Sequence, residues 1–350
     1  MLFLKTTKER FEKLKEVRIR PLILRCSIRH VHGAQDIPYT LEELIVLCVV
    51  RNGEMHVKSF IEHHLALGVK HIVLLDNGST DDTIAIAKRY PHVTILSTKC
   101  PYRVFETHMK HYLVRRFSRL RWSLFADIDE LFDYPFSDVL SLKMLLAYLN
   151  AHSYTAVVTQ MLDMFSEHSL GQQHSDKEDS VREIYTYYDA SNIHSYGEYN
   201  FGTLSNKEVK FHYGGIRKTL FGTDNGLTKA ALILLSDELV PFVGWHHVAN
   251  ARIADFTCVL LHYPFVGSFR EKVREAVESD RYGCTCASRE YLKYWEGLKD
   301  TDIVLKLETA SKFVDVNSLV QSGFLVVSEA YRRWVALYGG GNSDFEATRN

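Results

Sequence analysis

The sequence has few cysteines and no long apolar segment, and each shortage excludes a class of protein. Six cysteines are scattered through 350 residues, too sparsely for a disulfide-stapled fold, and this usage fits a reducing compartment. Residues 284–286 read Cys-Thr-Cys, but the spacing is not that of a zinc motif and no matching pair follows, so we expect free thiols. No apolar run approaches the roughly 18 residues that a membrane-spanning helix needs.

An excess of charge of either sign is also missing. The chain has 42 Lys and Arg against 43 Asp and Glu, a formal net charge of −1, so the strongly basic surface of a general nucleic-acid binder is not expected. With 46% hydrophobic and 24% charged residues, the composition is that of an ordinary globular protein and excludes disorder, collagen and coiled coil. This nearly neutral charge balance fits a protein that acts on glycans or small molecules better than one that binds nucleic acids.

The exception is the segment 1–29, which holds nine Lys and Arg against three Glu, interleaved with apolar side chains such as Phe11, Leu14 and Leu22. It lacks the apolar core and the cleavage site of a secretory signal. Two interpretations stay open: a solvated leader helix packed on the protein, and a basic amphipathic segment touching an anionic membrane surface. The expected location is therefore the cytoplasm, either free or peripheral to a membrane.

From residue 44 onward, short apolar runs alternate with helical patterns. Strands are expected over residues 44–50, 71–75, 93–96 and 122–126, and helices over 55–67, 81–90 and 105–120. A turn at Asp76 is followed by Ser79 or Thr80 as the helix N-cap. This alternation predicts an α/β fold with a mostly parallel, Rossmann-like sheet flanked by helices, and ligands at the carboxyl ends of the strands.

After Pro135 the pattern loosens. Helices are expected over 139–150, 269–279, 288–298 and 303–313, strands over 155–161 and 256–261, and an exposed loop over 167–180. The predicted organisation is a basic leader (1–40), one catalytic domain (41–265) with halves 41–135 and 136–265, and a helical C-terminal extension (266–350).

The strongest chemical signal is the acidic cluster after the fourth expected strand. Asp127 and Asp129 are two residues apart, so on an extended chain they face the same side. Carboxylate oxygens suit Mg²⁺ or Mn²⁺, ions that use one or two carboxylates together with substrate phosphates. The structural alternative is a solvated loop or a helix cap.

A second signal is the turn Asp-Asn-Gly-Ser-Thr-Asp-Asp-Thr at residues 76–83. A carboxylate at a strand end can accept hydrogen bonds from a base or a ribose, and the following helix N-terminus offers free N–H groups to an anion. The alternative is a well-capped turn without a ligand.

Together these motifs resemble family 2-type glycosyltransferases of the GT-A fold. The resemblance covers residues 44–135 and rests on Arg-Asn-Gly-Glu at 51–54, Phe60 to Gly68, the turn at 76–83 and Phe-Ala-Asp-Ile-Asp-Glu at 125–130. It implies a UDP- or GDP-linked sugar donor, Mn²⁺ or Mg²⁺, and inverting hexosyl transfer to a glycan or another hydroxyl acceptor. It assigns 41–135 to the nucleotide-sugar and 136–265 to the acceptor. The residues it places at the nucleotide-sugar are Arg51, Asn52, Glu54, Asp76, Asn77, Ser79 and Asp81.

A weaker match continues through the second half, at residues 162–164, 214–221 and 260–263. The resemblance favours His262 as a third metal ligand beside Asp127 and Asp129; the alternative is a core histidine. Arg217 and Lys229 have the chemistry to clamp a diphosphate, although either would also serve as a surface charge.

The general base that inverting transfer requires is the least determined residue. Asp163 and Asp224 are the candidates, and neither outranks Glu238. His246 and His247 follow Trp245, whose ring would suit a sugar face or a structural aromatic cluster.

Three other functions stay open. A nucleotidyltransferase would share sheet, metal and nucleotide, but it expects a Gly-rich basic loop where this chain has residues 51–55. An aspartate phosphatase also uses an Asp-x-Asp motif, but its nucleophilic aspartate should follow the first strand, whereas the acid pair of this chain follows the fourth expected strand. A non-catalytic glycan-binding or scaffold protein would not need the acidic cluster.

Overall fold

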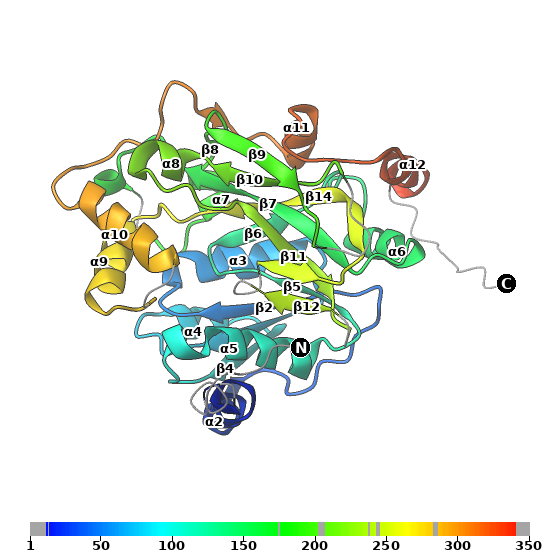
Figure 1. The fold of residues 1–350 in the computed structure, drawn as a ribbon, viewed down its shortest axis with the longest axis horizontal. Coiled ribbons are helices and arrows are strands. Elements are labelled where there is room, and N and C mark those ends of the chain that lie inside the picture. The colour runs from blue at the N-terminus through cyan, green and yellow to red at the C-terminus, as the bar shows by residue number, and fades with distance from the viewer. Residues whose placement is uncertain are drawn as a thin grey trace.

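The computed structural model describes residues 12, 14–173, 176–201, 207–236, 239–242, 246–282 and 286–340. One large mixed sheet crosses the middle of the molecule, and helices lie around it (Figure 1). Strands run through its centre in the order β1-β4-β3-β2-β5-β11-β7-β14-β6. The predicted α/β, Rossmann-like class is confirmed.

The parallel part of the sheet comes from the first half of the chain. It consists of β4 (Val93–Ser97), β3 (His71–Asp76), β2 (Ile45–Val50) and β5 (Trp122–Phe125), each parallel to its neighbour. The helices between them are α3 (Glu54–Ala66), α4 (Thr83–Ala87) and α5 (Tyr102–Phe117). All four expected strands and all three expected helices of this half are confirmed. The expected cap differs, because Asp82 is the N-cap of α4 and makes no side-chain cap hydrogen bond.

The second half adds strands of both directions. β11 (Thr228–Leu234) is antiparallel to β5 and to β7 (Ala156–Phe165), whereas β14 (Ile253–His262) is parallel to β7 and antiparallel to β6 (Glu130–Asp133). The parallel character is therefore concentrated in β4 to β5 and in the β7–β14 pair. The remaining elements of this half are α6 (Leu142–Ala151), η2 (Leu170–Gln172), α7 (Val181–Ile184), β8 (Tyr187–Tyr188), β9 (Ile193–Glu198), β10 (Lys210–Gly214), α8 (Ile216–Phe221), β12 (Val240–Phe242) and β13 (His247–Ala249).

The C-terminal region is helical but differs from the expectation in one segment. It contains α9 (Phe269–Glu278), α10 (Cys286–Leu298), α11 (Val316–Gln321) and α12 (Glu329–Tyr338). The helix expected over 303–313 is wrong: Val304 bridges Ser169, and β15 (Ser311–Lys312) pairs with β8. Backbone pairing with the body of the protein has overridden the apolar pattern there. The domain boundaries at residues 40 and 265 stay predictions.

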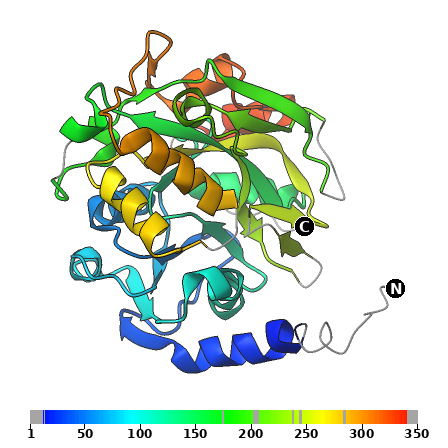
Figure 2. The ribbon, with the colours of Figure 1, turned by 60° about the vertical axis from the view of Figure 1, so that its left-hand side comes forward.

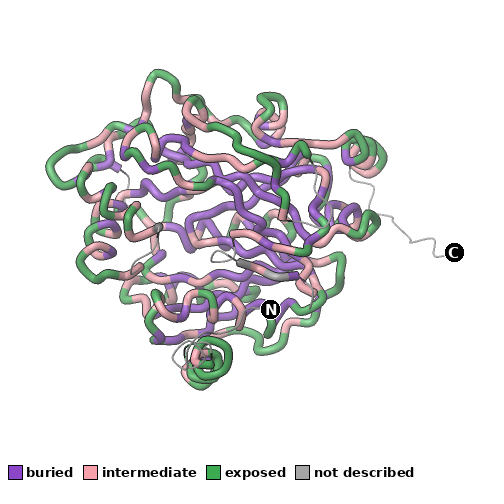
Figure 3. Tube along the Cα trace, viewed as in Figure 1, coloured by how far each residue is buried: buried purple, intermediate pink, exposed green. Residues whose placement is uncertain are grey.

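Both faces of the central strands are buried, as Figure 3 shows by colour. Along β2, Val46, Cys48 and Val50 join one apolar cluster, while Ile45 and Leu47 join the other. Because successive side chains of a strand point to opposite faces, the two clusters are the two sides of the sheet. The faces of the sheet thus form the core, and the strand ends are left for a site.

The segment before the sheet forms two consecutive helices, η1 (Lys15–Ile19) and α2 (Arg20–Ser27), followed by the edge strand β1 (Arg29–His32). Part of the predicted leader thus belongs to the sheet, because β1 pairs with β4. The helices lie along the outside of the molecule (blue in Figure 2). Among the described residues, no helix combines the length and apolarity needed to cross a bilayer.

Candidate active site

Strand register brings together three polar residues that are distant in the chain. β6 pairs with β14 so that Glu130 stands opposite His262, and β14 pairs with β7 so that His262 stands beside Asp163. Residues paired across neighbouring strands project from the same face of a sheet. Glu130, His262 and Asp163 therefore form one row.

A tight turn after β5 adds the two predicted metal ligands to this row. The backbone N–H of Asp127 donates to Oε2 of Glu130 at 2.8 Å, and the N–H of Glu130 donates to the carbonyl of Asp127 at 3.0 Å. The turn places Asp127 and Asp129 beyond the carboxyl end of β5, as the sequence predicts.

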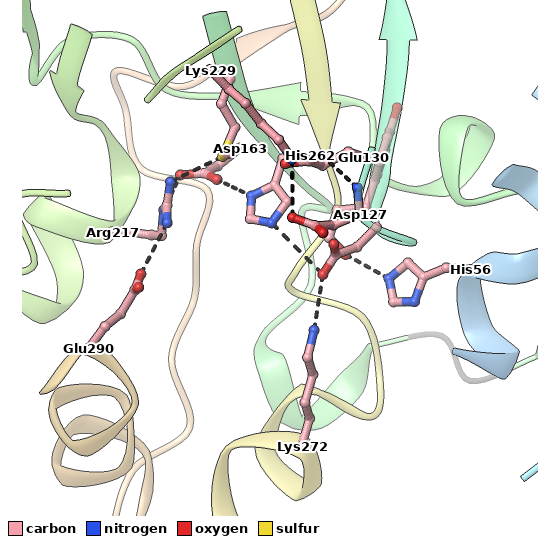
Figure 4. Close-up of polar contacts among 12 residues, drawn as sticks. His56, Asp127, Glu130, Asp163, Arg217, Lys229, His262, Lys272 and Glu290 are labelled. Atoms are coloured by element: carbon pink, nitrogen blue, oxygen red, sulfur yellow. Dashed lines mark hydrogen bonds and ion pairs between the residues drawn. The ribbon is translucent and has the colours of Figure 1, made fainter. Parts of the chain in front are cut away.

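Each of these aspartates is paired with a lysine (Figure 4). Nζ of the fully buried Lys229 on β11 donates to Glu130 at 2.7 Å and to Asp127 at 3.2 Å. Nζ of Lys272 on α9 donates to Oδ2 of Asp129 at 3.0 Å. The acids are thus partly neutralised from two different elements.

His262 connects the aspartate pair to a second ionic group. Its Nδ1 lies 2.6 Å from Oδ1 of Asp163, and its Nε2 lies 3.8 Å from Oδ2 of Asp129. The other oxygen of Asp163 accepts from Nε of Arg217 at 2.8 Å, and Arg217 also donates to Glu290 of α10 at 3.0 Å. Both oxygens of Asp163 are therefore engaged inside the protein.

The surrounding cations keep the acids ionised. Burial opposes ionisation of Asp127, but Lys229 and Lys110 outweigh it and lower its pKa to about 2. Burial likewise opposes ionisation of Asp129 and Asp163, yet their pKa values lie below the usual range because of Lys272 and Arg217 respectively.

Glu130 and His262 behave differently. Burial raises the pKa of Glu130 despite Lys229. Burial alone would lower the pKa of His262, but the hydrogen bond to Asp163 and the charge of Asp129 raise it. Three carboxylates of the row, on Asp127, Asp129 and Asp163, therefore carry negative charge at neutral pH.

The donor chemistry of Asp127, Asp129 and His262 fits a divalent cation. Two ionised carboxylates and an imidazole are suitable ligands for Mn²⁺. Hydrogen bonding of Nδ1 to Asp163 leaves Nε2 on the side of Asp129, which is how metal-bound histidines are held by a carboxylate partner. Within the described part of the chain, no three His, Cys, Asp or Glu side chains already lie close enough together to hold a metal ion. Because Lys272 donates to Oδ2 of Asp129, an ion bound there would compete with this lysine.

The two predicted nucleotide loops are braced against each other. Oδ1 of Asn52 accepts from the N–H of Thr80 at 2.9 Å, and the N–H of Asn52 donates to Oγ of Ser79 at 2.9 Å. The N–H of Glu54 donates to Oδ2 of Asp81 at 3.1 Å. Asn52, Glu54, Ser79 and Asp81 thus form a framework that shapes this edge; their predicted contact with a nucleotide stays a prediction.

Asp76 and Asn77 organise the end of β3. The carboxylate of Asp76 accepts from the backbone N–H groups of Gly78 and Ser79 and from the hydroxyl of Ser97. Nδ2 of Asn77 donates to the carbonyls of Thr98 and Cys100. β2 lies between β3 and β5, so Asp76 stands two strands away from the acidic turn.

Helix α9 reaches across to both parts of this edge. Besides the contact of Lys272 with Asp129, Glu275 accepts from Arg51 at the end of β2, at 2.8 Å. Just beyond α9, Asp280 accepts from Arg103 of α5 at 3.0 Å. The first half of the sheet and the C-terminal helices are thereby tied together over the acids.

The remaining candidates lie in varied positions. Asp224 is half exposed and pairs with Lys218 at 3.0 Å, apart from the row. Burial and then Lys229 and Lys110 lower the pKa of His246 to about 3, so a neutral imidazole stands near Asp127. His247 packs among aromatic rings, with centroids 5.3 Å from Phe201 and 5.7 Å from Tyr199. Glu238, Trp245 and Cys284 lie outside the described residues.

Sequence reasoning missed the roles of three residues. Lys272 is one of several charges on an exposed amphipathic helix, and Glu290 and Lys110 lie on helices too, so none stood out by spacing. Lys110 is almost fully buried, donates to Glu106 at 2.9 Å and lies 5.3 Å from the centre of the Phe125 ring. A buried lysine next to the acids is visible only in three dimensions.

Comparison with known proteins yields only slight similarities. No protein family matches the chain, and no curated protein matches it. A solved structure of glucosyl-3-phosphoglycerate synthase from Mycobacterium tuberculosis with Mn²⁺, UDP and glucosyl-3-phosphoglycerate is 17% identical over 38% of this chain and 52% of that chain, with a TM-score of 0.25. The same enzyme with Mn²⁺, UDP-glucose and phosphoglyceric acid is 18% identical over 38% and 50%, with a TM-score of 0.26.

A 4-diphosphocytidyl-2C-methyl-D-erythritol synthase is 13% identical over 39% of this chain and 70% of that chain, with a TM-score of 0.23. The chain matches about half the length of the synthase structures from Mycobacterium tuberculosis. Similarities this slight do not assign a function, which has to be argued from the residues of this chain.

Proposed function

We propose that this protein is a metal-dependent glycosyltransferase that uses a nucleotide-diphospho-sugar donor. The observation that carries the proposal is the ionised pair Asp127 and Asp129 at the carboxyl end of β5, with Nε2 of His262 facing Asp129. Ligands of open α/β sheets bind at this edge. The GT-A resemblance of residues 44–135 supports the same assignment.

In this proposal Asp127, Asp129 and His262 hold Mn²⁺ or Mg²⁺, with Asp76, Asn77 and the braced loops shaping the nucleoside side. When bound, the ion neutralises the charge that develops on the departing nucleoside diphosphate. Lys229 and Lys272 offer further positive charge beside the same acids, and preorganised charge of this kind stabilises a leaving anion.

The reaction breaks the bond between the anomeric carbon and the diphosphate oxygen and forms a bond from that carbon to the acceptor oxygen. The acceptor hydroxyl loses its proton to a base. Asp163, with both oxygens engaged and a low pKa, is better suited to orienting His262 than to accepting this proton. Asp224 stands apart from the row. Arg217, bound to Asp163 and Glu290, is assigned to the same orienting group.

The direct test mixes the purified protein and Mn²⁺ with a panel of UDP- and GDP-sugars and measures the released nucleotide. Release of a nucleoside diphosphate with one sugar supports the proposal. Release of pyrophosphate from a nucleoside triphosphate and a sugar phosphate would identify a nucleotidyltransferase, and neither reaction across the panel would favour a binding protein.

The site residues are tested with Asp127→Asn and Asp129→Asn. Each removes a charged ligand without removing apolar area, so we expect the turnover to fall by about a hundredfold or more while the melting temperature stays near that of the wild type. Asp138→Asn, an exposed acid after β6, is the matched control and should retain full activity. Wild-type turnover in both site variants would overturn the metal assignment.

A further inference from the structure

The N-terminal helices expose an unusual amount of apolar surface. Among the described residues, five of the fourteen exposed large hydrophobic side chains lie between residues 14 and 23, and the other nine are spread from residue 31 to residue 337. Leu22 is 62% exposed, Ile23 48% and Ile19 38%. Isolated exposed hydrophobics are ordinary, but a local concentration marks an interaction site.

Three of these five side chains, those of Ile19 at the end of η1 and of Leu22 and Ile23 on α2, lie on one side of the helix; Leu14 and Val17 do not share their spacing. Ile19, Leu22, Ile23 and the exposed Cys26 follow the i, i+3, i+4, i+7 spacing, which puts them on one helix face. We call these four residues the outer stripe.

The helix is already attached to the protein by a different face. Leu24 is buried in the apolar cluster under α5, and Ile28 packs against the same cluster. The hydroxyl of Ser27 lies 2.7 Å from that of Thr98. The outer stripe is therefore not needed to hold α2 in place. Its side chains are exposed, and the helix itself lies along the outside of the molecule (Figure 2).

Basic side chains outnumber acidic ones around the outer stripe, although Lys15 pairs with Glu12 and Arg20 with Glu16. Residues 14–29 contain five basic side chains, those of Lys15, Arg18, Arg20, Arg25 and Arg29, and one acidic side chain, that of Glu16. The chain as a whole carries a net charge of −1, so this excess belongs to the helix. A helix with an apolar face and basic flanks has the composition that lies in the interface of an anionic bilayer.

We propose that α2 docks this protein on an anionic lipid surface, with the outer stripe entering the headgroup region and Arg18 and Arg25 contacting lipid phosphates. The interaction is independent of the proposed sugar transfer and concerns where the protein works. A second copy of the chain is a poorer occupant, because two such helices placed face to face would bring like charges together.

The test measures co-sedimentation of the full chain with vesicles of phosphatidylcholine alone and of phosphatidylcholine mixed with phosphatidylserine. We expect binding to the mixed vesicles only, weakening as salt is added. The double variant Leu22→Ser/Ile23→Ser should lose most of the binding. Arg18→Gln/Arg25→Gln should weaken it about fivefold for each charge removed.

Val314→Ser is the matched control, because Val314 is 77% exposed on another part of the surface; it should bind as the wild type does. Thermal unfolding establishes that each variant is folded, and exposed side chains of this kind should change the melting temperature little. Equal binding to neutral vesicles, or no binding to either, would overturn the proposal. A dimer in solution that Leu22→Ser/Ile23→Ser dissociates, without vesicle binding, would assign the stripe to self-association instead.

Discussion

His262 is held by Asp163 through a 2.6 Å contact between Nδ1 and Oδ1, and this contact determines which ring nitrogen faces Asp129. A carboxylate beside Nδ1 holds a proton on that nitrogen, so that Nε2 is the nitrogen available to a metal ion. Asp163 is in turn fixed by Arg217. The row is therefore directional, with Nδ1 of His262 at Asp163 and Nε2 facing Asp129.

The first prediction concerns Asp163→Asn. Loss of the carboxylate removes the preference for one tautomer of His262, so we expect the affinity for Mn²⁺ to fall about 10- to 100-fold. An electron paramagnetic resonance titration measures the affinity, and the nitrogen coupling of the imidazole should weaken in parallel. Asp224→Asn is the control. Unchanged Mn²⁺ affinity and coupling in Asp163→Asn would contradict the positioning role.

The second prediction concerns Lys229→Met. The change leaves the buried carboxylate of Glu130 without its ammonium partner, and we expect the free energy of unfolding to fall by about 3–5 kcal/mol in urea titrations. Adding Glu130→Gln should restore part of the loss. Lys272→Met removes a partner that is 36% exposed but leaves the buried Asp129 with only His262 nearby, so it should cost less, about 1–3 kcal/mol. If both lysine variants lowered the free energy of unfolding by the same small amount, the buried pair of Lys229 and Glu130 would contribute little to stability.

A third prediction separates stability from donor binding at Asp76. Asp76→Ala leaves the N–H groups of Gly78 and Ser79 without their acceptor, which should lower the free energy of unfolding by about 1–3 kcal/mol. If the proposed function is right, KM for the donor should rise more than kcat falls, because nucleoside contacts are similar in the ground and transition states. A collapse of kcat at constant KM would place Asp76 at the reacting centre instead.

The fourth prediction is an acid sensitivity that arises in the core. His64 is fully buried; its Nδ1 lies 2.7 Å from the carbonyl of Phe60, and its Nε2 accepts from the N–H of Phe132, so the ring is neutral. Burial, together with His63, lowers the pKa of His64 from 6.5 to about 3. Between these values the unfolded chain binds more protons than the folded one, so stability falls as the pH falls below about 6.5.

Urea unfolding across that pH range measures the effect. One such histidine contributes up to about 1.4 kcal/mol per pH unit, and His56, whose pKa burial lowers to about 4, adds to it. His64→Gln should reduce the slope of the free energy of unfolding against pH by the contribution of one proton. An identical slope in the variant would show that His64 does not carry it.

Local sequence patterns were sufficient to predict a strand or helix where that element buries its own periodic apolar side chains. The four strands from β2 to β5 and the helices between them were predictable, since an apolar run of about four to seven residues followed by a helical pattern has one ordinary solution. The caps of α11 and α12 are local as well: Asp315 accepts from the N–H of Ser318, and Ser328 accepts from the N–H of Tyr331.

Local patterns failed where partners are distant. The segment 303–313 has apolar spacing like that of a helix, yet Leu305 is buried in the cluster around Phe265 and Tyr294, and the chain pairs with Ser169 and with β8. The residues of the segment itself give no indication of these distant partners.

The sequence by itself determined the α/β class, the place of Asp127 and Asp129 after a buried strand, and the turn at Asp76, because each depends on residues adjacent in the chain. The tertiary structure alone decided that Asp163, His262 and Glu130 stand in one row and that Lys229 and Lys272 reach the acids. Register between strands separated by some hundred residues is set by packing of the whole sheet, and it moves a side chain to the opposite face with a shift of one residue.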